Sequence, residues 1–283
     1  MTESILKDLK KCGAILSIVF YLTVLSISLA FAGDIVVYGD SQHNQEAHQL
    51  IVNEILKTQP SIVFRVGDMV NDGNSPEQWQ TLRTISQKLF KTVEYFPALG
   101  NHEKESPLYF ENFPYLHNQK WYSVERQGIH FIVLDSNAEF QVGSAQYQWL
   151  ESDLRGIKDE TKFKIVIFHH PLFGVSMHQE DEKGLKPILM PLLEKYGVNA
   201  VFSGHDHNYA RFEYKGIIFI TTGGGGSNLV NQTRSSPYLK KFVKTWHYCV
   251  ITPDENFLSV RVLDIFSAVI DEFEISSLVL SGV

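Results

Sequence analysis

The chain has 283 residues, of which 44% are hydrophobic and 20% are charged. That length and apolar content suffice for one large domain with a substantial buried core. The formal net charge is −7 and the isoelectric point is near 5.9. We therefore expect no nucleic-acid partner, because nucleic-acid-binding proteins usually present a basic face. The sequence contains no run of basic residues, no low-complexity segment and no repeat.

The N-terminus has the composition of an export signal. Lysines within residues 7–11 precede an apolar stretch at 14–29, and the small-residue site Ala30-Phe31-Ala32 follows. This order is typical of a secretory signal peptide. We expect residues 1–32 to be cleaved after Ala32, which leaves 33–283 as one mature domain in the periplasm or secreted. An uncleaved membrane anchor is the alternative, since the apolar stretch is near the lower limit for spanning a bilayer.

Two cysteines are present, and they predict no disulfide in the mature chain. Cys12 falls within the expected signal peptide, so only Cys249 remains. Cys249 lies in a strand-like run at 246–251, where a free cysteine usually behaves as a small apolar residue. We expect it to be buried, with a reactive thiol as the alternative.

The first hundred residues of the mature chain alternate between strand and helix patterns. Apolar runs at 35–38 and 62–66 predict strands, and helical spacing of apolar residues over 44–57 predicts a helix between them. Ser75-Pro76 marks the start of a second helix, because serine caps a helix and proline suits its first position. Residues 93–99 then lead to a further polar loop.

The same alternation continues to the C-terminus. Further helices are predicted at 144–154 and 185–196. Further strands are predicted at 121–124, 129–134, 165–168, 200–202, 217–221, 248–251, 257–263 and 269–275. This pattern favours an α/β fold whose functional side chains lie on the loops.

Five short motifs of metal-binding residue types directly follow predicted strands. They are Gly39-Asp40-Ser41-Gln42, Gly67-Asp68-Met69-Val70-Asn71, Gly100-Asn101-His102-Glu103, Phe168-His169-His170-Pro171 and Gly204-His205-Asp206-His207. Open α/β sheets collect their ligands at the carboxyl ends of strands. Asp, Asn and His donors suit borderline divalent or trivalent metals, whereas a soft metal would call for thiolates.

The five motifs, in this order and with this spacing, resemble the calcineurin-like metallophosphoesterase superfamily, and most closely its branch related to purple acid phosphatases. The resemblance runs from about Asp34 to Ile275. It implies a single-domain, four-layer α/β/β/α sandwich with two mixed sheets and a site at their shared edge. The additional β-domain of the plant enzymes is not expected, since the first motif closely follows the signal peptide.

The resemblance also implies two metal ions, which could be Fe, Mn or Zn. It assigns Asp40, Asp68 and His207 to one metal, and Asp68, Asn101, His169 and His205 to the other. Such a pair neutralises a phosphate ester and acidifies water, and the implied nucleophile is a hydroxide that bridges the two ions. His102 is implied to be catalytic, either protonating the leaving group or stabilising the transition state.

Several neighbouring residues have open roles. Glu103 or Asp72 could hold the ring of His102. His170 is a candidate substrate contact, or it forms a hydrogen bond behind a metal ligand. His178 lies in a loop that overhangs the site in relatives, so it is either a substrate contact or a surface histidine. Arg211 is expected to have a structural role.

Two positions depart from the family pattern. Gln42 stands where many relatives have histidine. It could bind a metal through its amide oxygen, leave a water in its place, or let His43 take over. Asn71 stands where purple acid phosphatases have a tyrosine ligand. Without a tyrosinate, we expect a colourless or weakly coloured protein even when it is loaded with iron.

The motifs favour an exported, metal-dependent phosphoesterase that acts on a phosphate-ester substrate. An acid phosphatase-like monoesterase is favoured over a phosphodiesterase, and loops 106–119 and 172–184 are expected to select the ester. A non-catalytic scaffold that holds phosphate or metal is the alternative from another class. Gln42 is its only support, while His102 beside Asn101 argues against it. The sequence does not indicate the oligomeric state.

Overall fold

The computed structural model describes residues 33–158 and 160–277. The expected signal peptide and its cleavage site lie outside these described residues. Within the two described ranges, no helix has both the length and the apolar character needed to cross a membrane.

The first sheet has six strands and is mixed. β1, β2 and β3 run parallel, and β11 pairs antiparallel with β1 before continuing into an antiparallel meander. In spatial order the strands are β13 (Val269–Ser276), β12 (Phe257–Asp264), β11 (His247–Pro253), β1 (Ile35–Tyr38), β2 (Ile62–Arg65) and β3 (Glu94–Pro97).

The second sheet has seven strands and is also mixed. β5, β6, β7 and β9 run parallel, whereas β4, β8 and β10 pair antiparallel with their neighbours. In spatial order the strands are β10 (Leu239–Val243), β8 (Tyr209–Tyr214), β9 (Ile217–Thr222), β7 (Ala200–Ser203), β6 (Phe163–Ile167), β5 (Ile129–Val133) and β4 (Tyr122–Arg126).

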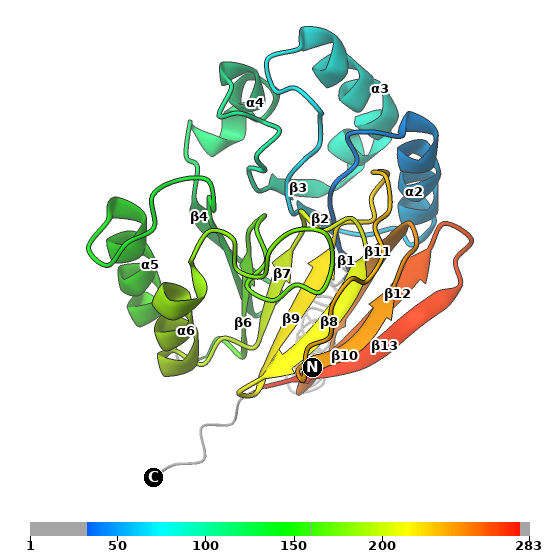
Figure 1. Cartoon of the computed structure of the whole chain (residues 1–283). Coiled ribbons are helices and arrows are strands. Elements are labelled where there is room, and N and C mark those ends of the chain that lie inside the picture. Colours follow the sequence, from blue (N-terminus) through cyan, green and yellow to red (C-terminus); the bar gives the residue numbers. More distant parts are fainter. Residues whose placement is uncertain (1–32, 159, 278–283) are drawn as a thin grey trace, which may run out of the picture. The chain divides into compact units, whose positions relative to one another are not determined.

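The longer helices begin where the sequence places capping residues. Asn44, Ser75 and Ser144 each accept a hydrogen bond from a main-chain N–H in the first helical turn. The helices are α2 (Gln45–Lys57), α3 (Pro76–Thr92), α4 (Pro107–Asn112), α5 (Ala145–Gly156) and α6 (Lys186–Lys195), with a short 3₁₀ helix, η1 (Pro114–Leu116). Helices α5 and α6 lie beside the second sheet, and α2 and α3 lie beside the first (Figure 1).

The core has two layers because alternate residues of the second sheet face opposite sides. In β5, Phe131 packs with residues of the first sheet, and its ring stacks on Phe64 of β2 with centroids 4.4 Å apart. The intervening Ile132 packs instead with residues of α5 and α6. Sheet therefore packs on sheet, and the predicted α/β/β/α sandwich of two mixed sheets is confirmed.

Most predicted elements are present, and four were missed: β10, β8, α4 and the 3₁₀ helix η1. Strand β10 carries two lysines and is only half buried at the edge of its sheet, so its sequence lacks a clear apolar run. Strand β8 begins two residues after the last metal motif, and α4 has only six residues. As expected, Cys249 is a free, buried thiol on β11.

Packing between the sheets predicts a large loss of stability for Phe64→Ala. This ring is fully buried, and its removal leaves a cavity between two sheets that cannot close. We expect a loss of about 3–5 kcal/mol in the free energy of unfolding, measured by urea denaturation. The control is Phe266→Ala, whose ring is 81% exposed and which should change stability little. Equal stability of the two variants would contradict this account of the core.

Candidate metal centre

The site begins with a strained backbone at the ends of three strands. Asp40 follows β1, Asp68 follows β2 and His205 follows β7, and their φ angles are 58°, 51° and 68°. Residues other than glycine rarely adopt this left-handed conformation, and it costs of order 1–3 kcal/mol at each position. The strain turns all three side chains toward one edge shared by the two sheets.

Four predicted ligands form a compact donor cluster. Asn101 Oδ1 lies 2.9 Å from His169 Nε2 and 3.1 Å from His205 Nδ1. The two imidazole nitrogens are 3.2 Å apart, and Asp68 Oδ2 lies 3.3 Å from His169 Nε2. Donors about 2.1 Å from one ion are about 3.0–3.4 Å apart at usual coordination angles. The spacing therefore matches the edges of a coordination polyhedron.

In two of the histidine rings, a hydrogen bond on the side away from the centre determines which ring nitrogen is free to bind a metal. His169 Nδ1 donates to the carbonyl of Val66 at 2.8 Å, and His207 Nδ1 donates to the carbonyl of Asn228 at 3.0 Å. A carbonyl can only accept, so in both rings Nδ1 carries a proton and Nε2 is the nitrogen available to a metal.

The other predicted cluster is looser, and Gln42 lies inside it. His207 Nε2 is 3.7 Å from Asp40 Oδ1. The amide nitrogen of Gln42 lies 3.3 Å from Asp68 Oδ2 and 3.4 Å from His207 Nε2, where a cation would sit. Ser227 donates to Gln42 Oε1 at 2.6 Å. A 180° rotation of the Gln42 side-chain amide would exchange the positions of its two atoms. Its oxygen would then face a metal, and its nitrogen would donate to the Ser227 hydroxyl.

Asp40 provides an observation that a metal at this edge would explain. Within residues 33–158 and 160–277, its Oδ2 atom is buried and has no hydrogen-bond partner. Its Oδ1 accepts from the main-chain N–H of His205 at 2.9 Å. A Cβ at Gly204 would lie 2.3 Å from the free oxygen, so only glycine leaves it room. A buried, unpaired carboxylate oxygen is costly, and a bound cation would satisfy it.

His102 is oriented by the main chain, which corrects one expectation. Its Nδ1 donates to the carbonyl of Asn71 at 2.8 Å, so neither Glu103 nor Asp72 holds the ring. Glu103 is buried and instead accepts from the main-chain N–H groups of Asp68, Met69 and Gly100. Asp72 pairs with Lys104 at 3.2 Å. The free Nε2 of His102 lies 3.8 Å from Asp68 Oδ2, at the edge of the cluster.

One acidic residue near the cluster was not predicted. Glu182 Oε1 lies 3.0 Å from His205 Nε2 and 3.8 Å from His170 Nε2. The contact with His205 is a charge contact without hydrogen-bond geometry, since His205 Nε2 has no hydrogen-bond partner among the described residues. His170 itself is buried, and its Nδ1 hydrogen-bonds the Ser136 hydroxyl at 2.8 Å. The acidic run that contains Glu182, next to His178, was the available sequence signal.

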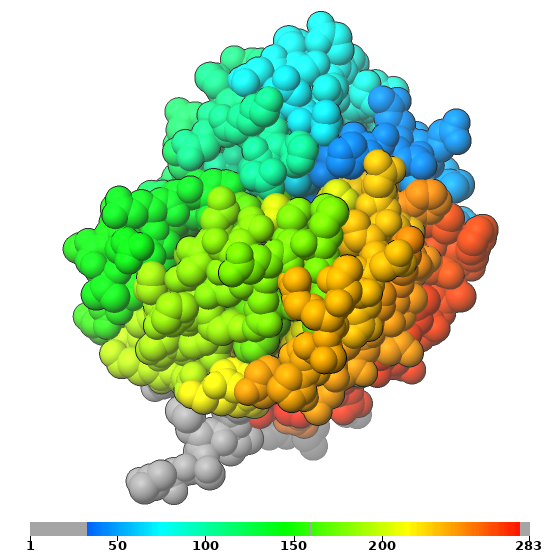
Figure 2. All heavy atoms as spheres, in the orientation of Figure 1, coloured from blue at the N-terminus to red at the C-terminus, as the bar shows by residue number. Residues whose placement is uncertain are grey.

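His178 is brought to the same place by its loop. Its ring stacks on His205 with centroids 3.8 Å apart, and its Nδ1 lies 3.0 Å from Asp206 Oδ1. Arg234 donates to the carbonyls of Gly174 and His178 and so fastens the loop. In the space-filling view, the yellow-green surface around residues 170–190 lies beside the blue and cyan surface of the earlier loops (Figure 2).

Two other candidate residues have different surroundings. His43 is exposed, and its ring centroid lies 6.0 Å from that of His102 and 5.7 Å from that of His207. Arg211 donates to Asp271 Oδ2 at 2.8 Å, which ties β8 to β13 and gives the arginine a structural contact.

The electrostatics of the cluster prepare it for a cation. Burial alone would raise the pKa of Asp68, but the neighbouring His169 outweighs burial and holds that pKa at about 2. Burial alone would lower the pKa of His169, but the Asp68 carboxylate outweighs it and raises that pKa to about 10. Burial lowers the pKa of His205 to about 2 and that of His207 to about 4. Burial also raises the pKa of Asp40 well above its usual value, so in the metal-free protein protons on His169 and Asp40 take the place of a cation.

The proton on His169 predicts that metal affinity rises with pH. Near neutral pH, the Asp68 carboxylate keeps a proton on His169 that a metal must displace, whereas burial lowers the pKa of His205 and His207 and keeps both rings neutral. We expect the apparent affinity to rise about tenfold per pH unit for each proton released. Titration calorimetry of Mn²⁺ binding in buffers of different ionisation enthalpy counts those protons. Binding without proton release would contradict the assignment.

Gln42 predicts two metal sites of unequal strength. We expect Mn²⁺ calorimetry to resolve a tight site and a weaker one, and Gln42→His to strengthen only the weaker. An imidazole binds such a metal more tightly than a neutral amide oxygen does. Ser227→Ala should weaken that site about tenfold, because the amide loses its orienting partner. Ser136→Ala is the matched control, since its hydroxyl contacts His170. If Gln42→His changes neither affinity, Gln42 does not face a metal.

The chain is similar in sequence to known phosphoesterases. The profile described as "Calcineurin-like phosphoesterase" matches residues 33–209. Purple acid phosphatase 18 of Arabidopsis thaliana is 31% identical over 186 residues, which are 57% of this chain and 42% of the plant protein. This chain spans about half the length of the curated relatives it matches.

Two solved structures share the fold. Purple acid phosphatase PPD1 from yellow lupin (Lupinus luteus) seeds superposes with a TM-score of 0.75 at 20% identity, covering 86% of this chain and 53% of the lupin chain. GAP50 of Plasmodium, described as the anchor in the inner membrane complex, superposes with a TM-score of 0.73 at 17% identity. That match covers 87% of this chain and 89% of GAP50.

Proposed function

The chain belongs to the calcineurin-like phosphoesterase family, and from that premise we propose that it is a metal-dependent phosphoester hydrolase with a dinuclear centre. The observation that carries the proposal is the compact cluster of Asp68, Asn101, His169 and His205. Asp40, His207 and Gln42 would hold the second ion, with Asp68 shared between the two. When bound, such a pair neutralises the phosphate and acidifies water.

His102 is placed to handle the leaving group. Its Nδ1 proton is committed to the carbonyl of Asn71, so only Nε2 faces the cluster. In the protonated ring, Nε2–H donates to the departing alkoxide, and a positioned acid of this kind contributes about 10²–10⁴-fold to the rate. The rings of His170 and His178 both lie against His205. These two histidines are proposed to contact the phosphate oxygens or to hold the metal-ligating histidines in position.

The proposed reaction is hydrolysis of a monoester. Purple acid phosphatases are among the curated relatives, and their name favours phosphatase activity over diester cleavage. The metals are proposed to be Fe, Mn or Zn, on the strength of the oxygen and imidazole donors. Export through a signal peptide at residues 1–32, to the periplasm or outside, is part of the same proposal.

A non-catalytic scaffold is the second candidate function. GAP50, which superposes along most of its length, is described as an anchor. In this chain, the Gln42 amide occupies the position expected for one cation, which would weaken that metal site. The orientation of His102 toward Asp68 favours the enzyme.

Substitution of Asp68 and His102 tests the enzyme. We expect Asp68→Asn to abolish metal-dependent hydrolysis of p-nitrophenyl phosphate, because it removes the shared carboxylate. His102→Ala should lower kcat by about 10²–10⁴-fold while metal binding, followed by calorimetry, is retained. The matched control is Asp72→Asn, which lies nearby but does not hold the His102 ring, and should stay within about twofold of wild type.

The outcomes separate the candidates. Hydrolysis of p-nitrophenyl phosphate in preference to its bis-ester supports the monoesterase, and the reverse preference supports a phosphodiesterase. Folded, metal-loaded protein that hydrolyses neither ester with Mn, Zn, Fe or Co would favour the scaffold.

A further inference from the structure

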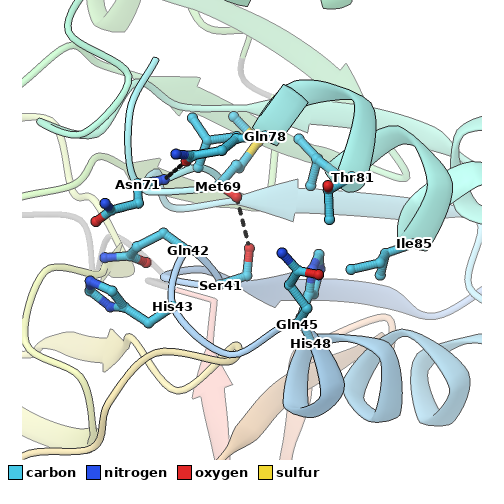
Figure 3. A pocket seen from close by; sticks show the side chains of 12 residues that line it. Ser41, Gln42, His43, Gln45, His48, Met69, Asn71, Gln78, Thr81 and Ile85 are labelled. Carbon is cyan, nitrogen blue, oxygen red and sulfur yellow. Dashed lines mark hydrogen bonds between the residues drawn. The ribbon is translucent and has the colours of Figure 1, made fainter. Parts of the chain in front are cut away.

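A pocket of about 280 Å³ lies between α2 and α3, beside the metal centre. Gln42 and His43 approach it from the loop after β1, and Asn71 approaches from the loop after β2 (Figure 3). Gln45 from α2 and Ile85 from α3 face one another across it (Figure 3). The volume is at the lower end for ligand pockets, so it suits a small molecule.

The pocket adjoins both the metal centre and His102, the proposed proton donor to the leaving group. Gln42, on its wall, lies 3.3 Å from Asp68 through its amide nitrogen. Asn71, also on its wall, holds the ring of His102 through its carbonyl. A phosphate at the metals whose ester oxygen faces His102 would therefore direct its alcohol portion into this pocket.

The lining is polar but uncharged. None of the 12 lining residues is Lys, Arg, Asp or Glu. His48 is buried, and burial lowers its pKa well below the usual value, so it is neutral at physiological pH. The Arg65 guanidinium lies behind the wall, where its terminal nitrogens donate to Tyr38, Tyr95 and Ser41. The wall thus offers no charged partner for a second phosphate or for an ammonium group.

Two side-chain amides have unused hydrogen-bonding groups. Gln78 Oε1 accepts from the main-chain N–H groups of Asn71 at 2.8 Å and Asp72 at 2.9 Å, which fixes the amide. Within residues 33–158 and 160–277, its Nε2 has no partner, and neither does the side chain of Gln45. Such groups bind hydroxyls, which both donate and accept.

Apolar side chains complete the lining. Ile85 of α3 provides carbon surface across the pocket from Gln45, with the buried Leu82 and Val70 behind the wall. A sugar or polyol is complementary to this lining, because its hydroxyls can bind the amides and its C–H groups can pack on the apolar side chains. We propose that this pocket receives the uncharged, hydroxyl-bearing alcohol of a phosphate monoester, so that the substrate class is sugar or polyol monophosphates. This inference rests on the proposed phosphoesterase function.

The experiment compares esters that differ in the alcohol alone. We expect kcat/KM to be at least tenfold higher for fructose 6-phosphate than for fructose 1,6-bisphosphate, whose second phosphate has no charged partner here. Gln45→Leu should lower kcat/KM for fructose 6-phosphate about fivefold, as expected for one hydrogen bond. It should leave p-nitrophenyl phosphate within about twofold. Gln49→Leu is the matched control on the same helix, because its side chain does not line the pocket.

A binding measurement separates this inference from the proposed activity. Saturation-transfer NMR follows free fructose on the folded, metal-loaded protein with inorganic phosphate. A signal that Gln45→Leu abolishes and Gln49→Leu retains supports the pocket even if no ester is hydrolysed, in which case only the proposed function fails. Ester hydrolysis without fructose binding, or a preference for the bisphosphate, would overturn the pocket assignment and leave the phosphoesterase intact.

Discussion

The centre depends on one buried carboxylate, that of Asp68, and on the groups that hold it. Its backbone is in the left-handed region, and Glu103 accepts hydrogen bonds from the N–H groups of Asp68, Met69 and Gly100. A Cβ at Gly100 would lie 2.1 Å from Asp68 Oδ1, so the loop closes around this side chain only with glycine there. The strained turn at Asp68 and the buried Glu103 thus hold the two oxygens of this carboxylate between the two donor clusters.

The main chain then decides which nitrogen each ring presents. Three histidines on different loops, His102, His169 and His207, donate Nδ1–H to a backbone carbonyl and leave Nε2 toward the centre. His205 is reversed, with Nδ1 toward the centre and Glu182 at Nε2. The orientation of the first three rings is therefore set before any metal binds, and these rings lose little freedom on binding. Only Gln42 has to turn its amide.

Sequence patterns predicted most single strands and helices because these are local, whereas the two-sheet sandwich and the ligand set were predicted from the family resemblance of the five motifs. Apolar periodicity placed β1 and α2, and each motif after a strand marked the same sheet edge. It missed β10 because an edge strand with two lysines lacks an apolar run. It missed Glu182 and the Asn71 carbonyl because these act across loops, and a main-chain acceptor leaves no signature in the residue types.

The central claim is that one edge of the two sheets holds two ions that share Asp68. Anomalous diffraction from crystals soaked in Mn²⁺ tests it directly. The account predicts two peaks, one ligated by Asp68, Asn101, His169 and His205, and a weaker one ligated by Asp40, Asp68, His207 and Gln42. A single peak among His169, His170 and His205, whose nitrogens lie close enough together to hold an ion, would contradict it.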